Sequence, residues 1–99
     1  MTLTAVDSAK VSLRGRSLYA RALGLNLLKA RERRGLSQER LAHAAGISAY
    51  TYQKFEKGES RPGAPMNPRL TTLIALCQVL GVTVEEILPP GAPDLTMGR

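Results

Sequence analysis

The sequence predicts an all-α protein, a compact bundle of five helices, on three observations. Apolar residues recur at helical spacing in several segments of the 99-residue chain. Serine or threonine precedes most of these segments and glycine follows them, as is typical of helix ends. No stretch alternates apolar and polar residues as a strand does, and the valines at 79, 82 and 84 lie among helix and turn residues.

The first helix is predicted from residue 17 or 18 to Arg34. One side of it is apolar and consists of Leu23, Leu27 and Ala30. Arginine and lysine occupy the other side, and Gly35 follows the last turn. This arrangement is typical of an amphipathic helix that packs on a core and ends at a glycine.

Residues 1–16 show no sustained period and contain Gly15, so they predict a basic, flexible N-terminal arm. Its two arginines, Arg14 and Arg16, are suited to a phosphate backbone or a minor groove. The alternative is that they are simply solvated. The sequence is therefore divided into an arm at 1–16, a domain at 17–88 and a C-terminal tail at 89–99.

The segment from Gln38 to Lys57 predicts two short helices joined by a turn at Gly46. Ser37 and Ser48 each precede one of these helices and are suited to cap it, because a hydroxyl accepts a hydrogen bond from an unpaired amide one turn further on. The second helix has an apolar face with Tyr52 and Phe55. Its opposite face consists of Tyr50, Gln53, Lys54 and Lys57. This is the layout of a helix-turn-helix that recognises DNA.

The same segment resembles the helix-turn-helix of the phage repressor and Cro superfamily, also called the xenobiotic-response-element family. Counted from Gln38, that motif has a small residue fifth, glycine ninth, and apolar residues fourth, eighth, tenth, fifteenth and eighteenth. The matching residues here are Ala42, Gly46, Leu41, Ala45, Ile47, Tyr52 and Phe55. The flanks RERRGLSQ (31–38) and FEKG (55–58) are similar to R-x-x-x-G-L-S-Q and I/L-E-x-G. The resemblance covers roughly residues 20 to 88 and implies a five-helix, lambda-repressor-like domain with its helix-turn-helix at helices 2 and 3.

By this resemblance the third helix lies in the major groove of DNA. The residues expected to contact base edges are Ala49, Tyr50, Gln53 and Lys54. Lys54 can donate to guanine, and Tyr50 can offer its hydroxyl or pack on a thymine methyl. The residues expected to contact phosphates are Gln38, Ser48, Thr51, Lys57 and Arg61. The alternative is that Tyr50 and Lys54 merely lie on a solvated face.

The resemblance also implies an ion pair between Arg31 and Glu56. In the family the matching arginine and glutamate pair at the far end of the third helix. Carried over, the pair is partly buried and fixes the first helix to the third. Its role is structural, not catalytic.

The segment between Gly58 and Pro68 is predicted to be a loop, because it contains several prolines and Gly63. A fourth helix is expected to start near Pro68 or Arg69, with Asn67 as its cap, and to stop at Gly81. Its inner face is predicted to consist of Leu70, Leu73, Ile74, Cys77 and Leu80.

The last helix is predicted to be short and to run through Leu88. Thr83 and Glu86 have the spacing of a capping box at its start. The prolines that follow end the helix, and the residues after them are expected to be frayed.

Composition excludes several kinds of site. The single cysteine, Cys77, excludes an intramolecular disulfide and is expected in the core. The single histidine, His43, has no second ligand at a metal-binding spacing. No nucleophile lies beside a base and no glycine-rich phosphate loop precedes a helix, so we expect no enzyme, no metal and no cofactor. No apolar stretch is long enough for a membrane span, and a cytoplasmic protein with no membrane partner is expected.

The distribution of charge favours a polyanionic partner. The net charge is +6. Residues 1–35 carry eight basic and two acidic side chains, whereas residues 70–99 carry one basic and three acidic. A basic N-terminal part and an acidic C-terminal part are suited to a protein that presents one end to nucleic acid. A solvated surface with a charged arm is the alternative.

Together these features predict a sequence-specific, repressor-like transcriptional regulator that binds double-stranded DNA. One such domain contacts a half-site, so a homodimer on a palindromic operator is expected, with its interface at residues 82–95. The alternative is an antitoxin or other interaction module of the same fold, whose main partner is a protein such as a toxin or a coactivator.

Overall fold

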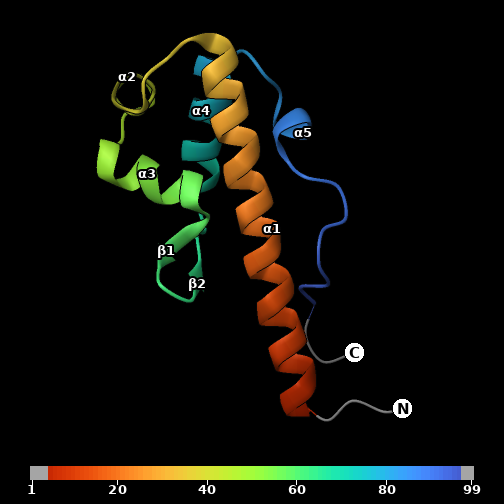
Figure 1. Ribbon diagram of the computed structural model, residues 1–99. Helices are drawn as coiled ribbons and strands as arrows, with labels where there is room; N and C mark the ends of the chain where they lie inside the picture. The colour runs from red at the N-terminus through yellow and green to blue at the C-terminus, as the bar shows by residue number, and fades with distance from the viewer. Residues whose placement is uncertain (1–4, 97–99) are drawn as a thin grey trace.

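The computed structural model describes residues 5–96, and the side chains from residue 14 onward (Figure 1). In chain order its elements are α1 (Ala5–Arg34), α2 (Gln38–Ala44), α3 (Ala49–Lys57), β1 (Glu59–Arg61), β2 (Ala64–Pro65), α4 (Leu70–Leu80) and α5 (Val84–Ile87). The predicted all-α class with five helices is confirmed, with a small two-stranded sheet added within the described residues.

The long helix α1 divides the molecule in Figure 1. The helices α2 and α3 and the small sheet lie on one side of it, and α5 with the C-terminal tail lies on the other. The helix α4 lies behind α1 and closes the bundle. The helices α2 and α3 thus pack on α4 and α1 respectively.

A single apolar core joins these helices. Its fully buried large side chains are Leu27, Leu41, Tyr52 and Leu76, one from each of the four main helices. The other buried apolar residues are Ala20, Leu23, Ala30, Ala42, Phe55, Met66, Leu73, Cys77, Leu80 and Ile87. Burial of this apolar surface is the main driving force for the fold.

The predicted start of the first helix at residue 17 or 18 is wrong, because α1 begins at Ala5. Residues 5–16 are therefore helical where an irregular arm was expected. They contain no proline, and a single glycine inside a helix costs only about 1 kcal/mol relative to alanine. Residues 1–4 lie outside the described part of the chain.

The loop after α3 contains a short β-hairpin, which the sequence did not predict. Glu59 pairs with Pro65 and Arg61 with Ala64 in antiparallel register. The turn between them is Pro62-Gly63, and Gly63 has φ of 80°. Proline before a left-handed glycine is typical of a type II turn. Five strand residues are too few to show the alternation by which a strand is recognised.

The predicted start of α4 at Pro68 or Arg69, with Asn67 as its cap, is also wrong. The helix begins at Leu70 with Arg69 as its N-cap, and no side chain caps it. Arg69 has extended backbone angles (φ −63°, ψ 149°), so the first helical residue is Leu70 and Asn67 lies too far before it to be the cap.

The inner face of α4 is rotated relative to the prediction. Leu70 is 69% exposed and Ile74 is 36% exposed. The buried residues are Leu73, Leu76, Cys77 and Leu80. Cys77 is in the core as expected. Leu76, which was not predicted to be on the inner face, is buried, whereas Leu70 and Ile74 are not.

The C-terminal tail is held against α1 where a frayed end was expected. The Thr83–Glu86 capping box is present, and both of its hydrogen bonds measure 3.0 Å. The Tyr19 hydroxyl donates to the Pro89 carbonyl, just beyond α5, at 2.7 Å. The Asn26 side-chain amide donates to the carbonyl of Ile87, the last residue of α5, at 2.8 Å. Tyr19 and Asn26 are seven residues apart, so they share one face of α1 and bind α5 and the start of the tail along it. The last three residues lie outside the described part.

Candidate nucleic-acid interface

The two helices of the helix-turn-helix begin where the serines predicted them to begin. The Ser37 hydroxyl accepts from the Arg40 amide at 3.1 Å, and the Ser48 hydroxyl accepts from the Thr51 amide at 3.1 Å. Between the two helices Gly46 has φ of 78°, a left-handed conformation that costs a side-chain-bearing residue energy. Local capping and one glycine therefore fix the angle between α2 and α3.

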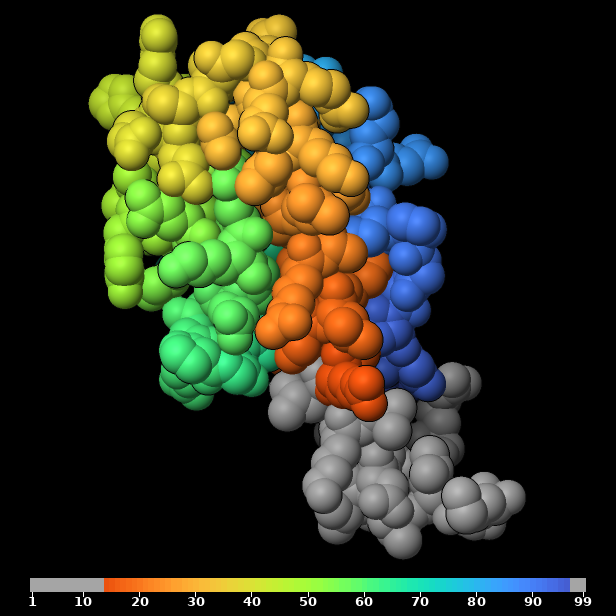
Figure 2. All heavy atoms as spheres, viewed as in Figure 1, coloured from red at the N-terminus to blue at the C-terminus, as the bar shows by residue number. Residues whose placement is uncertain are grey.

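The helix α3 has one buried face and one exposed face. Tyr52 and Phe55 are buried in the core. On the other side Tyr50 is 68% exposed, and Lys57 is also exposed. Figure 2 shows α2 and α3, in yellow to green, at one edge of the molecule, where the N-terminal and C-terminal segments do not cover them in this view. The helix α3 therefore has the expected orientation, with its apolar face in the core and its polar face exposed.

The two principal base-contacting candidates lie against each other. The Lys54 ammonium is 4.3 Å from the centre of the Tyr50 ring, a cation–π contact between residues one helical turn apart. Gln53 and Ala49 are partly exposed beside them. The four base-contacting candidates thus lie together on the exposed part of α3.

The phosphate-contacting candidates divide into two groups. Gln38, Ser48 and Thr51 lie in the first turns of α2 and α3 or at their caps. The Ser48 hydroxyl donates to the Thr51 hydroxyl at 2.9 Å, which leaves the Thr51 proton directed elsewhere. Lys57 lies in the last turn of α3, and Arg61 lies on β1 beyond it; both are exposed. The candidates therefore extend along the exposed side from the start of α2 to the hairpin.

Gln38 has a second role that the sequence did not indicate. Its side-chain amide donates to Oε1 of Glu56 at 2.9 Å. One amide proton is therefore used to join the start of α2 to the end of α3. The second amide proton is available to a phosphate or to water, and the carbonyl oxygen can accept from water.

The Arg31–Glu56 ion pair is present, as the resemblance implied. Nε of Arg31 is 2.6 Å from Oε2 of Glu56, and Nη2 donates to Oε1 at 3.2 Å. Nη1 of Arg31 donates to the Leu36 carbonyl at 2.9 Å. The side chain of Arg31 is 16% exposed and that of Glu56 is 5% exposed. The pair therefore joins α1, the α1–α2 turn and α3.

The ion pair shifts the protonation equilibria of both partners. The hydrogen bond to Glu56 raises the pKa of Arg31. Burial raises the pKa of Glu56, but the hydrogen bonds from Arg31, the nearby Tyr52 hydroxyl and the hydrogen bond from Gln38 outweigh it and hold that pKa below its ordinary value. Both residues are therefore charged in the folded state near neutral pH.

A close crossing of two backbones, at Gly24 and Gly58, also positions α3. A Cβ on Gly24 would lie 2.5 Å from the carbonyl oxygen of Phe55, and a Cβ on Gly58 would lie 2.7 Å from Cα of Arg21. Only glycine permits this approach of α1 to the end of α3. Sequence reasoning missed Gly24. The helical spacing of Ala20 and Gly24, two small residues on the core side, was the signal that could have indicated it.

His43 is exposed on α2. Among the described residues, no three side chains of the metal-ligating types lie close enough together to hold an ion. Within the same part of the chain, no helix combines the length and the apolar character that a bilayer crossing requires.

A glycine turn between two short helices, the second of them exposed and tied to the bundle by a buried ion pair, defines a helix-turn-helix protein of the phage repressor and Cro type. The chain belongs to the helix-turn-helix domain family, whose model matches residues 22–88.

Two curated relatives and one solved structure are similar to this chain. A SPbeta prophage-derived uncharacterized HTH-type transcriptional regulator, YonR, of Bacillus subtilis (strain 168) is 37% identical over 65 residues, which are 66% of this chain and 55% of that protein. The chain thus spans about half the length of that relative. The uncharacterized HTH-type transcriptional regulator y4dJ of Sinorhizobium fredii (strain NBRC 101917 / NGR234) is 32% identical over 68 residues, 69% of this chain and 80% of that protein.

The structure is similar to the restriction-modification controller protein C.AhdI from Aeromonas hydrophila. The TM-score is 0.60 at 26% identity, over 70% of this chain and 96% of that one. The predicted family is confirmed by these similarities. Both curated relatives are named as transcriptional regulators, in agreement with the prediction that the chain is not an enzyme.

Proposed function

We propose that this protein is a sequence-specific DNA-binding regulator that recognises its operator with α3 in the major groove. The observation that carries the proposal is the exposed face of α3, where Tyr50 and Lys54 form a cation–π pair. An α-helix fits the major groove, where the four base pairs present different donors, acceptors and methyl groups. The names of the relatives, both transcriptional regulators, support the same function.

In this proposal the side chains of α3 have distinct roles. Lys54 donates to guanine, and Tyr50 contacts the neighbouring base through its hydroxyl or ring edge. Ala49 and Gln53 complete the contact with base edges. The phosphate contacts come from Gln38, Ser48, Thr51, Lys57 and Arg61, and they fix the register of the protein without selecting sequence.

We further propose that the active form is a homodimer on a palindromic operator. A half-site bound by one small domain gives limited affinity, and two-fold symmetry doubles the contact. We place the contact between copies on α4, because Leu70 and Ile74 are exposed apolar residues one turn apart. The segment at 82–95 is the less suitable interface, because its Ile87 and Pro89 are buried within the chain's own fold.

The proposal is tested by selection from random duplex DNA with the purified chain. We expect an enriched palindromic motif, and a binding affinity that falls steeply with salt as phosphates are neutralised. A Tyr50→Ala, Lys54→Ala double variant with an unchanged circular dichroism spectrum should lose the enrichment. A selection that returns no enriched motif from the folded, unmodified protein would refute the proposal.

The dimer is tested separately by sedimentation velocity. Ile74→Glu should convert the protein to a monomer, whereas Leu25→Glu, at a 48% exposed leucine on α1, should not. A protein that is monomeric without any substitution, at the concentration where it binds its operator, contradicts this part of the proposal.

The second candidate function is an antitoxin or coactivator-type module whose main partner is another protein. The same exposed residues, Leu70 and Ile74, favour it, because exposed apolar patches mark contact sites. A small partner that co-purifies in stoichiometric amount from the native host, and is lost with Ile74→Glu, would support this function. Such a result leaves DNA binding by α3 intact.

A further inference from the structure

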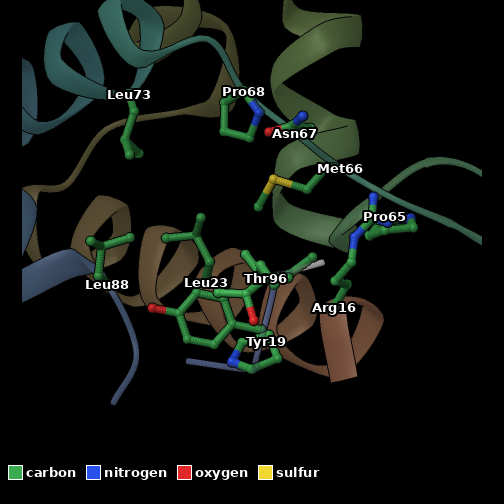
Figure 3. Close-up of a pocket in the computed structure, with 13 residues that line it drawn as sticks. Arg16, Tyr19, Leu23, Pro65, Met66, Asn67, Pro68, Leu73, Leu88 and Thr96 are labelled. Carbon is green, nitrogen blue, oxygen red and sulfur yellow. The ribbon is translucent and has the colours of Figure 1, made fainter. Parts of the chain in front are cut away.

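A cavity of about 580 Å³ lies on the side of α1 that faces the tail, apart from the exposed face of α3 (Figure 3). One wall is α1, with Tyr19 and Leu23. The opposite wall is the segment from the hairpin to α4, with Met66 and Leu73. Leu88, just before the tail, also lines the cavity. Its volume falls within the range of about 300–1,000 Å³ that is usual for small-molecule sites.

The walls of this cavity are held by hydrogen bonds that do not depend on a ligand. Tyr19 donates to the Pro89 carbonyl at 2.7 Å, which fixes the tail to α1. The Met66 amide donates to the Gly58 carbonyl at 2.9 Å, which fixes the opposite wall to the end of α3. The cavity is therefore built into the fold, as ligand sites usually are.

The lining is apolar in the middle and carries one cation at an end. In Figure 3 Leu23 and Tyr19 face Met66 across the cavity, and Arg16 follows Tyr19 along α1 toward one end. Within the part of the chain that the structure describes, the guanidinium of Arg16 makes no ion pair or hydrogen bond. An unpaired guanidinium beside an apolar cavity is a suitable partner for a carboxylate, to which it can donate two hydrogen bonds.

We propose that this cavity binds a small apolar carboxylate. Its hydrocarbon part packs on Leu23, Met66 and Leu73, and its carboxylate accepts hydrogen bonds from Arg16. The polar amide of Asn67, which also lines the cavity, adds a donor at the opposite wall. This site does not depend on DNA binding, and it is tested without DNA.

The test is a titration of the full chain with sodium decanoate, below the concentration at which it forms micelles, followed by amide chemical shifts. We expect saturable shifts at the residues that line the cavity. The alcohol 1-decanol has the same chain without the charge and should bind at least about ten-fold more weakly.

Three variants separate the parts of the proposal. Arg16→Gln should lower the affinity for decanoate about ten-fold, whereas Arg14→Gln, at an exposed arginine outside the cavity, should leave it unchanged. Leu88→Trp places a larger side chain at the cavity and should abolish saturable binding. Leu88 is 38% exposed, so the fold should tolerate this change, and the amide spectrum of the variant checks it.

Several outcomes overturn the proposal. If no saturable shifts occur around the cavity, the proposed binding site is refuted. If decanol and decanoate bind equally well and Arg16→Gln has no effect, the proposed recognition of the carboxylate by Arg16 is refuted. Shifts at these residues that follow protein concentration instead of decanoate show that a second copy of the chain occupies the cavity.

Discussion

The ammonium of Lys54 lies 4.3 Å from the centre of the Tyr50 ring, so two of the four side chains proposed to contact base edges hold each other in place. A cation–π contact of this kind restricts the rotamers of both residues before DNA arrives. Less conformational entropy is then lost on binding, and the pair approaches the groove as one unit.

This pairing predicts a distinctive pattern of losses in base recognition. Lys54→Met should cost about 1–3 kcal/mol at a single base pair of the operator and little elsewhere. Lys57→Met, the matched control on the same helix, should weaken all sequences alike because its partner is a phosphate. Affinity measurements on a panel of operators with single base changes distinguish the two.

Removal of Tyr50 tests the coupling itself. If the two residues act as one unit, the Tyr50→Leu, Lys54→Met double variant should lose less binding free energy than the two single variants together, because each single change already disrupts the pair. Strict additivity would show that the contact in the free protein plays no part in binding.

The buried ion pair predicts how stability depends on pH. The pKa of Glu56 is lower in the folded chain than its ordinary value, so its charged form stabilises the fold above an unfolded pKa of about 4.3. That contribution is lost as the pH falls through the folded pKa. The urea midpoint of the unmodified protein should therefore decrease as the pH is lowered below about 5.

Glu56→Gln should be less stable at neutral pH and should show a smaller fall in midpoint over the same acidic range. Glu32→Gln, at an exposed glutamate on α1, is the control and should follow the unmodified protein. Some acid dependence should remain in both variants. The Thr83 amide lowers the pKa of Glu86 by a hydrogen bond, and the hydroxyl and amide of Thr96 lower the pKa of Asp94 in the same way. An unchanged pH profile in Glu56→Gln would contradict the assignment.

The sequence predicted the parts of this structure that local rules determine. Ser37 and Ser48 cap their helices because a hydroxyl one turn before an amide is sufficient, and Gly46 marks the turn because it alone tolerates the left-handed conformation. The Arg31–Glu56 pair was predicted only through the resemblance to a family, since nothing local places residues 25 positions apart in contact.

The features that sequence reasoning missed depend on tertiary contacts. The tail lies along α1 because Tyr19 binds the Pro89 carbonyl, seventy residues away. The exposure of Leu70 and Ile74 depends on how α4 is rotated against the core, which an apolar pattern alone does not determine. The cavity beside Arg16 could not be predicted for the same reason.

The backbone crossing at Gly24 predicts a large effect from a small change. In Gly24→Ala the new methyl group would lie 2.5 Å from the carbonyl oxygen of Phe55, so α1 and α3 must separate. Overpacking of this kind costs about 1–3 kcal/mol, more than the gain in helix propensity. Chemical denaturation should show the loss, and affinity for the operator should fall because the end of α3 moves.

Gly15→Ala is the matched control, because Gly15, the other glycine of α1, faces a side-chain atom and no backbone. Its added methyl would lie 3.2 Å from Cβ of Pro93, a close contact that a small shift of the tail relieves, whereas at Gly24 the obstacle is backbone. We expect its stability to be unchanged or raised by up to about 1 kcal/mol, from the helix propensity of alanine. Equal stability of the two variants would show that the crossing at Gly24 adapts without cost.

The buried hydroxyl of Tyr52 makes the last prediction. Tyr52 is fully buried, and its hydroxyl lies close to Glu56 of the Arg31–Glu56 pair but makes no hydrogen bond of ordinary geometry with any described residue. Burial also raises the pKa of this hydroxyl. A buried polar group without a partner destabilises a fold, so its removal should be neutral or favourable.

Tyr52→Phe should therefore raise the free energy of unfolding by up to about 1 kcal/mol, as measured by urea denaturation. Tyr19→Phe is the control, and it should change the free energy of unfolding in the opposite direction. It removes a hydroxyl that donates to the Pro89 carbonyl at 2.7 Å, and it should cost about 1 kcal/mol. If Tyr52→Phe is destabilised as much as Tyr19→Phe, the hydroxyl of Tyr52 is hydrogen-bonded in solution, with Glu56 the nearest acceptor. The ion pair that supports α3 would then include a third member.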